Sequence, residues 1–73
     1  MIEVNYYYHT RDNKWKYGSN TFYDLEKACR FIYSVIRSKN KVFDGFTCDD
    51  EETRIYINRR CNLWKQQIKT KFI

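Results

Sequence analysis

The feature that most constrains this chain is an amphipathic stretch over residues 21–37, TFYDLEKACRFIYSVIR. Its apolar residues recur every three or four positions, which places them on one face of a helix. They are Leu25, Ala28, Cys29, Ile32, Val35 and Ile36, with Phe22 and Tyr33 at the margins. Thr21 and Asp24 have the spacing of a capping box, with Asp in place of the usual Glu or Gln. Because a stripe this wide must be covered, the flanking segments have to supply an apolar surface.

A length of 73 residues allows a single domain, residues 1–73, with a small core. Seven Tyr, five Phe and two Trp are too many for that core, so we expect some rings at the surface, where clusters mark contact sites. Three widely spaced Cys fit reduced thiols better than a disulfide framework. With no signal-peptide or membrane-spanning pattern, we expect a cytoplasmic protein without a membrane partner, in a bacterial host if the chain is phage-encoded.

Charge is distributed unevenly along the chain. The net charge is +5, but residues 53–73 alone carry +6 and contain no acid, so residues 1–52 carry −1. An acidic run, residues 49–52, stands directly before this basic segment. The positive charge is therefore a property of the C-terminal arm rather than of the whole domain.

The N-terminal residues alternate as in a strand over residues 2–9. One face would carry Ile2, Val4, Tyr6 and Tyr8, and the other Glu3, Asn5, Tyr7 and His9. Residues 11–14 form a polar turn, and residues 15–17 resume the alternation, so the two runs predict an antiparallel hairpin. Residues 18–20 are expected to end the second strand and lead into the helix.

Residues 42–48 indicate an irregular strand, interrupted at Asp44 and Gly45, where a bulge is expected. The acidic run would then be a hairpin loop and residues 53–58 the return strand. Ile55 and Ile57 support that reading, because they share one face of a strand but lie about 200° apart on a helix. The alternative is one long helix from Asp49 onward, whose acidic start and basic end suit the helix dipole.

From Arg59 onward the pattern is that of an amphipathic basic helix. Its narrow apolar seam consists of Ile57, Cys61, Trp64, Ile68 and Phe72. The sequence therefore predicts an α+β domain of order ββαββα, an antiparallel sheet with the central helix packed on one face and a basic C-terminal helix. That helix would either close the same core or project to meet a partner, and its seam could also pair with a second copy to form a homodimer.

The residues for catalysis are not assembled in any recognisable pattern. His9 is the only histidine, Cys29 belongs to the apolar stripe, and Cys48 stands beside four acids, an environment that does not favour a nucleophilic thiol. Zinc needs close pairs of Cys or His, and the only glycines, Gly18 and Gly45, are too far apart to form a glycine-rich phosphate loop. We therefore expect no enzyme, no catalytic or metal-binding residue, and no cofactor.

Binding chemistry fits the composition better. Aromatic and basic side chains alternate along the chain, although no RNP, KH, zinc-finger or helix–turn–helix signature is present. The candidate contact residues are Arg59, Lys65 and Lys69 of the arm, Arg30 and Arg37 of the central helix, and the aromatic Tyr7 and Trp15. We expect a non-enzymatic protein that occludes a surface, such as a phage or mobile-element accessory or anti-defence inhibitor of a host protein or nucleoprotein. The alternative is a nucleic-acid-binding module that uses the same surface.

Overall fold

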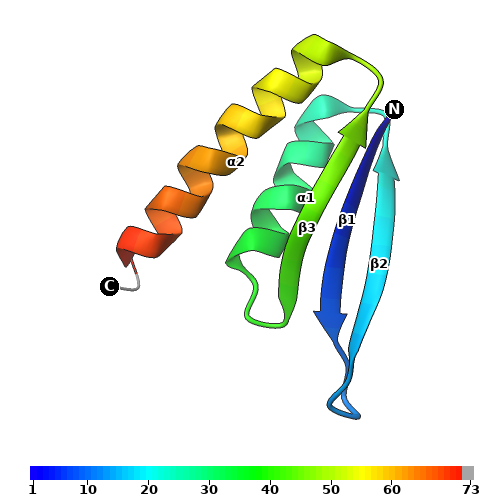
Figure 1. The fold of residues 1–73 in the computed structure, drawn as a ribbon, viewed down its shortest axis with the longest axis vertical. Coiled ribbons are helices and arrows are strands. Elements are labelled where there is room, and N and C mark those ends of the chain that lie inside the picture. The colour runs from blue at the N-terminus through cyan, green and yellow to red at the C-terminus, as the bar shows by residue number, and fades with distance from the viewer. Residues whose placement is uncertain (72–73) are drawn as a thin grey trace.

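The computed structural model describes residues 1–71, and the side chains of residues 1–66. Its elements in chain order are β1 Ile2–His9, β2 Trp15–Phe22, α1 Leu25–Arg37, β3 Lys41–Cys48 and α2 Glu51–Lys71. The strands form one antiparallel sheet of order β2-β1-β3. Figure 1 shows α1 against this sheet and α2 beside α1, next to β3. The predicted α+β class, with a central helix on an antiparallel sheet, is confirmed.

The alternation predicted for β1 separates the two faces of the sheet. Ile2 and Val4 are buried, and the Tyr6 ring lies 5.3 Å from the ring of Phe31 on α1. The face towards the helices is therefore the one that carries Val4. Tyr7 lies on the opposite face and is exposed.

Strand β2 is longer than the sequence predicted, because it pairs with β1 along its whole length, up to Phe22 opposite Ile2. Gly18 lies inside this strand instead of ending it. A Cβ atom at Gly18 would come within 3.2 Å of ring atoms of both Tyr6 and Tyr8. Glycine here makes room for two rings, as glycine in a strand does where other groups approach the backbone closely.

The expected capping box at Thr21 is wrong, since Thr21 belongs to β2 and α1 begins at Leu25. Asp24 caps this helix without it, by accepting a 2.8 Å hydrogen bond from the backbone N–H of Glu26.

The irregularity predicted in β3 is a β-bulge. Asn5 pairs with Gly45 and the next residue of β1, Tyr6, pairs with Phe43, so Asp44 is the extra residue. The Asp-Gly interruption in the sequence therefore marks the position where the register shifts.

The fourth strand expected over residues 53–58 does not form, and the alternative of one long helix describes this region correctly. Asp50 supplies the physical reason, because its carboxylate accepts hydrogen bonds from the backbone N–H and the hydroxyl of Thr53, at 3.2 and 2.6 Å. These bonds lower the pKa of Asp50, the one from the hydroxyl most. Glu51 and Glu52 add negative charge at the positive end of the helix dipole. The acidic run is thus a helix start, and the chain order is ββαβα.

The core joins all the layers of the fold. Its cluster of buried residues consists of Ile2, Val4, Ala28, Ile32, Ile57 and Cys61, with Val35 also buried. Because Ile57 and Cys61 come from α2, this helix closes the same core as α1 and the sheet. Ile57 and Cys61 of its apolar seam therefore face the protein's own interior.

Because Cys61 is buried, the domain is expected to lose stability at alkaline pH. Burial raises the pKa of this thiol from 9.0 to about 11. Below pH 9 the thiol is protonated in both the folded and the unfolded state, and the fold keeps its full stability. As pH rises from about 9 towards 11, only the unfolded state loses the proton, and the free energy of unfolding falls by about 2–3 kcal/mol in all. Urea unfolding of wild type and Cys61→Ala at pH 8 and above pH 10 should show the steeper loss in wild type. Parallel losses would contradict the expectation.

Candidate functional site

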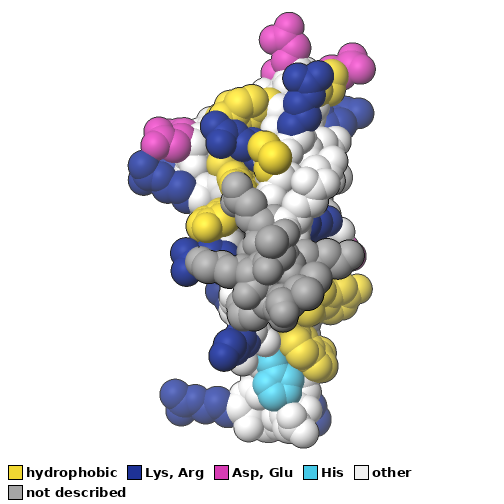
Figure 2. Space-filling view, turned by 90° about the vertical axis from the view of Figure 1, so that its left-hand side faces the viewer, with side chains coloured by type: hydrophobic (Ala, Val, Ile, Leu, Met, Phe, Trp, Pro, Cys, Tyr) yellow, Lys and Arg dark blue, Asp and Glu magenta, His cyan; other side chains and the backbone are white. Residues whose placement is uncertain are grey.

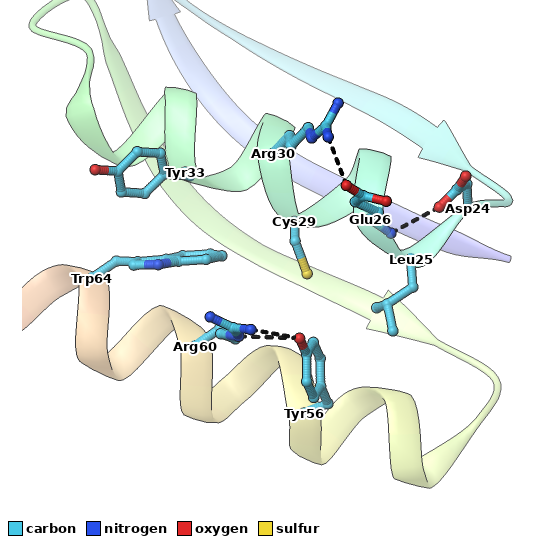
Figure 3. A pocket seen from close by; sticks show the side chains of 9 residues that line it. All are labelled: Asp24, Leu25, Glu26, Cys29, Arg30, Tyr33, Tyr56, Arg60 and Trp64. Carbon is cyan, nitrogen blue, oxygen red and sulfur yellow. Dashed lines mark hydrogen bonds and ion pairs between the residues drawn. The ribbon is translucent and has the colours of Figure 1, made fainter.

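A groove with a volume of about 740 Å³ lies between α1 and α2. That volume lies within the range of small-molecule and cofactor sites. Figure 3 shows side chains from both helices pointing towards this space. Rings, guanidinium groups and carboxylates all contribute, from Tyr33, Tyr56, Trp64, Arg30, Arg60, Asp24 and Glu26.

The α2 wall of the groove is built by Tyr56, Arg60 and Trp64. They are four residues apart, so they lie above one another on one side of the helix. The Arg60 guanidinium donates from Nε and Nη2 to the Tyr56 hydroxyl oxygen, at 3.1 and 2.8 Å, and its Cζ lies 5.2 Å from the centre of the same ring. A neutral phenol thus fixes this guanidinium, and among the described residues no carboxylate forms an ion pair with it.

The α1 wall is electrically more balanced. Arg30 forms a 2.6 Å ion pair with Glu26, one turn away, and both side chains are more than two-thirds exposed. An exposed pair of this kind is worth about 0.3–0.5 kcal/mol, so water or a partner can compete for it. Asp24 is occupied as the helix cap. Cys29 also lines the groove, and burial raises the pKa of its thiol against the opposing effect of the Arg60 charge.

Aromatic rings, more than carboxylates, position the cations on this side of the molecule. Arg37 lies over the ring of Tyr33 at 5.3 Å, and Lys65 lies over the ring of Phe43 at 5.4 Å. Tyr33 in turn meets Trp64 edge to face at 5.3 Å. A cation–π contact orders a charged side chain without neutralising it. These cations are therefore held in place while their charge stays available to a partner.

The structure brings only part of the predicted contact residues together. Arg30 lines the groove, and Arg37 lies beside it on the Tyr33 ring. Lys65 faces β3, whereas Arg59, six residues earlier, lies about 120° away around the helix. Lys69 belongs to α2, but its side chain lies outside the described residues. In Figure 2 the Lys and Arg side chains appear at several separate places rather than in one block.

Tyr7 and Trp15 lie elsewhere, on the face of the sheet that no helix covers. Both are exposed, and Trp15 packs against His9 with ring centres 5.0 Å apart. The aromatic and cationic candidates thus belong to two surfaces on opposite sides of the sheet.

Arg60 and Tyr56 are groove residues that the sequence did not single out. Their signal is the spacing of four, which favours contact on a helix and has no meaning in a strand. Once residues 53–58 are read as a strand, Tyr56 is separated from Arg60 and the groove disappears.

Neither metal chemistry nor known relatives add to this picture. Within the described part of the chain, no three His, Cys, Asp or Glu side chains come together in a way that could hold a metal ion. No helix there has both the length and the apolar character needed to cross a membrane. Comparison with protein-family models, curated proteins and solved structures gives no match. The groove itself is therefore the basis for a function.

Proposed function

We propose that this chain is a non-enzymatic binding protein that occupies an acidic surface of a partner protein through the groove between α1 and α2. The observation that carries the proposal is Arg60, a guanidinium oriented by Tyr56 and left without an ion pair among the described residues. Arginine beside aromatic rings is the combination most enriched at the energetic centres of protein interfaces. An incoming carboxylate would find a donor already oriented, and so would lose little entropy on binding.

Nucleic acid remains the second candidate, because the groove places rings and guanidinium groups side by side as a single strand requires. Two features favour a protein instead. Asp24 and Glu26 line the same groove and would repel a continuous chain of phosphates. The exposed rings of Tyr7 and Trp15 are on the other side of the sheet, too far away to extend a base-stacking path from the groove.

The mode of action that fits is occlusion. A small domain whose described residues assemble no catalytic group would act by covering what another molecule would otherwise contact. An accessory or anti-defence protein of a phage or mobile element, directed at a host protein or nucleoprotein, would work in this way. Arg60, the groove arginine without an ion pair among the described residues, would meet a single carboxylate within an acidic patch on such a target.

Arg60→Gln is expected to weaken capture of the partner about tenfold to hundredfold, because a hydrogen bond to a charged group is worth about 1.5–3 kcal/mol. The measurement is quantitative mass spectrometry of proteins retained from nuclease-treated lysate of candidate host cells by immobilised wild type and variant. Lys27→Gln removes an equal charge from an exposed position of α1 outside the groove lining and should retain the same proteins as wild type.

Equal retention by Arg60→Gln and wild type would remove the groove from consideration. Titration of single- and double-stranded oligonucleotides at two ionic strengths tests the second candidate. Direct binding that weakens steeply with salt, and is lost in Arg60→Gln, would favour nucleic acid over a protein.

A further inference from the structure

One face of the sheet carries exposed rings and no helix. Both helices lie on the side of Val4 and Tyr6, and nothing among the described residues covers the other side. Four large apolar side chains on that face are 41–53% exposed, namely Tyr7, Trp15, Tyr17 and Val42. A contiguous apolar patch of this kind on a small domain marks an interaction site.

The rings on this open face are fixed before any partner arrives. Tyr7 and Tyr17 meet edge to face with centres 4.9 Å apart. The Tyr17 hydroxyl donates a 3.0 Å hydrogen bond to Asp44, which links β2 to β3 across the central strand. Fixed rings lose little conformational entropy when they are covered, so this face is suited to docking.

Charge on the open face argues against a polyanion. The strand lysines belong to the other face: Lys16 and Lys41 both pair with Tyr8, and the Nζ of Lys41 lies 5.9 Å from the centre of the Tyr6 ring. The charged side chains of the strands on the open face are Glu3 and Asp44. Phosphates laid along it would meet two carboxylates and no strand cation.

The two ends of the open face differ in the size of their side chains and in the sign of their charge. The central cross-strand row holds Tyr7, Tyr17 and Val42. The next row towards the hairpin holds the rings of His9 and Trp15. The row on the other side of the centre holds the smaller Asn5, Ser19 and Gly45. A Cβ atom at Gly45 would meet no other atom within 4 Å, so space is open there. Beyond these rows, one end carries the acidic Glu3, and the hairpin turn at the other end carries Arg11, Asp12 and Lys14, with a net charge of +1.

We propose that a second copy of this chain docks on this face, antiparallel to the first, about a two-fold axis at the Tyr7 row. In that arrangement the rings of His9 and Trp15 lie over the small residues of the other copy. Glu3 of each copy approaches Arg11 of the other. A surface that is self-complementary about one axis in this way is what a closed isologous dimer requires.

This inference goes beyond the proposed function and does not depend on it. The dimer would have two sheets inside and the helices outside, so two grooves would face in opposite directions and bind a repeated target with higher avidity. The face measures only about 14 by 24 Å from the spacing and rise of its strands. That is less than a standard interface, so the dissociation constant of the dimer should be micromolar or higher.

The test is sedimentation of the full chain from low micromolar to millimolar concentration, with Gly45→Arg as the disrupting variant. The open space at Gly45, and a backbone φ outside the positive range, allow a side chain there without strain. We expect reversible dimers in wild type and at least a tenfold weaker association in Gly45→Arg. Asn58→Arg adds the same side chain at an exposed position of α2 and should dimerise like wild type.

A charge exchange fixes the orientation. Glu3→Arg and Arg11→Glu should each weaken the dimer, and the double variant should restore it. Within one chain Glu3 lies near the start of β1 and Arg11 in the turn beyond its end, more than about 20 Å apart. Restoration must therefore come from contact between copies. A monomer at millimolar concentration, dimers unaffected by Gly45→Arg, or no restoration in the double variant would each overturn the proposal.

Discussion

Replacing Ile32 with alanine is expected to remove about 2–5 kcal/mol from the free energy of unfolding. Ile32 has no exposed surface and belongs to the cluster that joins α1 to the sheet and to α2. Truncation leaves a cavity that neighbouring elements cannot fill without moving. A domain of 73 residues has a stability of only about 4–11 kcal/mol, so the variant should lose a large part of it. Urea unfolding followed by circular dichroism measures the change.

Ile55→Ala is the matched control, because it makes the same chemical change at a helical position that is 45% exposed. Its effect should stay within about 0.5 kcal/mol. Equal losses for the two variants would mean that burial of Ile32 is not what stabilises the domain.

The periodicity of apolar residues was sufficient to predict the elements that have one buried and one solvent-exposed face. The stripe of α1 contains Ala28, Ile32 and Val35, and all three are buried. The alternation of β1 separates the buried Val4 from the exposed Tyr7. Where one face is buried, the position of the apolar residues in the chain decides the local structure.

The same rule failed where local hydrogen bonding outweighed it. Ile55 and Ile57 favoured a strand, because a helix must leave one of them in water. The structure accepts that cost: Ile55 is exposed, Ile57 is buried, and Asp50 caps the helix through Thr53. An exposed isoleucine is common at protein surfaces, whereas the first amides of a helix need a partner such as a capping side chain. In this segment the helix cap, and not the spacing of the two isoleucines, determines the local structure.

The groove could not be predicted because it depends on how two helices lie side by side. Arg30 was a candidate from its helix alone, but the four-residue spacing of Tyr56 and Arg60 matters only once α2 is known to begin at Glu51. Likewise, the length of β2 depends on the pairing of Phe22 with Ile2, which is a contact between segments distant in sequence. Single-sequence patterns carry little information on such contacts.

Helix α2 has two roles that a basic arm does not require. One side of it, at Ile57 and Cys61, completes the core. An adjacent side, at Tyr56 and Arg60, forms the wall of the groove. The position of the Arg60 guanidinium therefore depends on how firmly Ile57 is docked. Stability and binding should be linked through this helix.

Ile57→Asp is expected to abolish the folded state rather than to release α2 alone. The variant places a carboxylate at a position with no exposed surface, in contact with the cluster that includes Val4 and Ile32. The uncompensated charge costs several kcal/mol, which is comparable with the whole stability of a domain this size. Amide hydrogen exchange should therefore show loss of protection in β1 together with α2.

Ile55→Asp puts the same residue two positions away on the same helix, at an exposed site, and should keep full protection in β1. If Ile57→Asp instead exposed only the amides of α2 while β1 and α1 stayed protected, the helix would be a separately stable arm. In that case Arg60 would be mobile in the native protein, and its orientation by Tyr56 would not be the basis of binding. Cooperative loss of both elements is expected because Ile57 belongs to the same cluster as Val4 of the central strand.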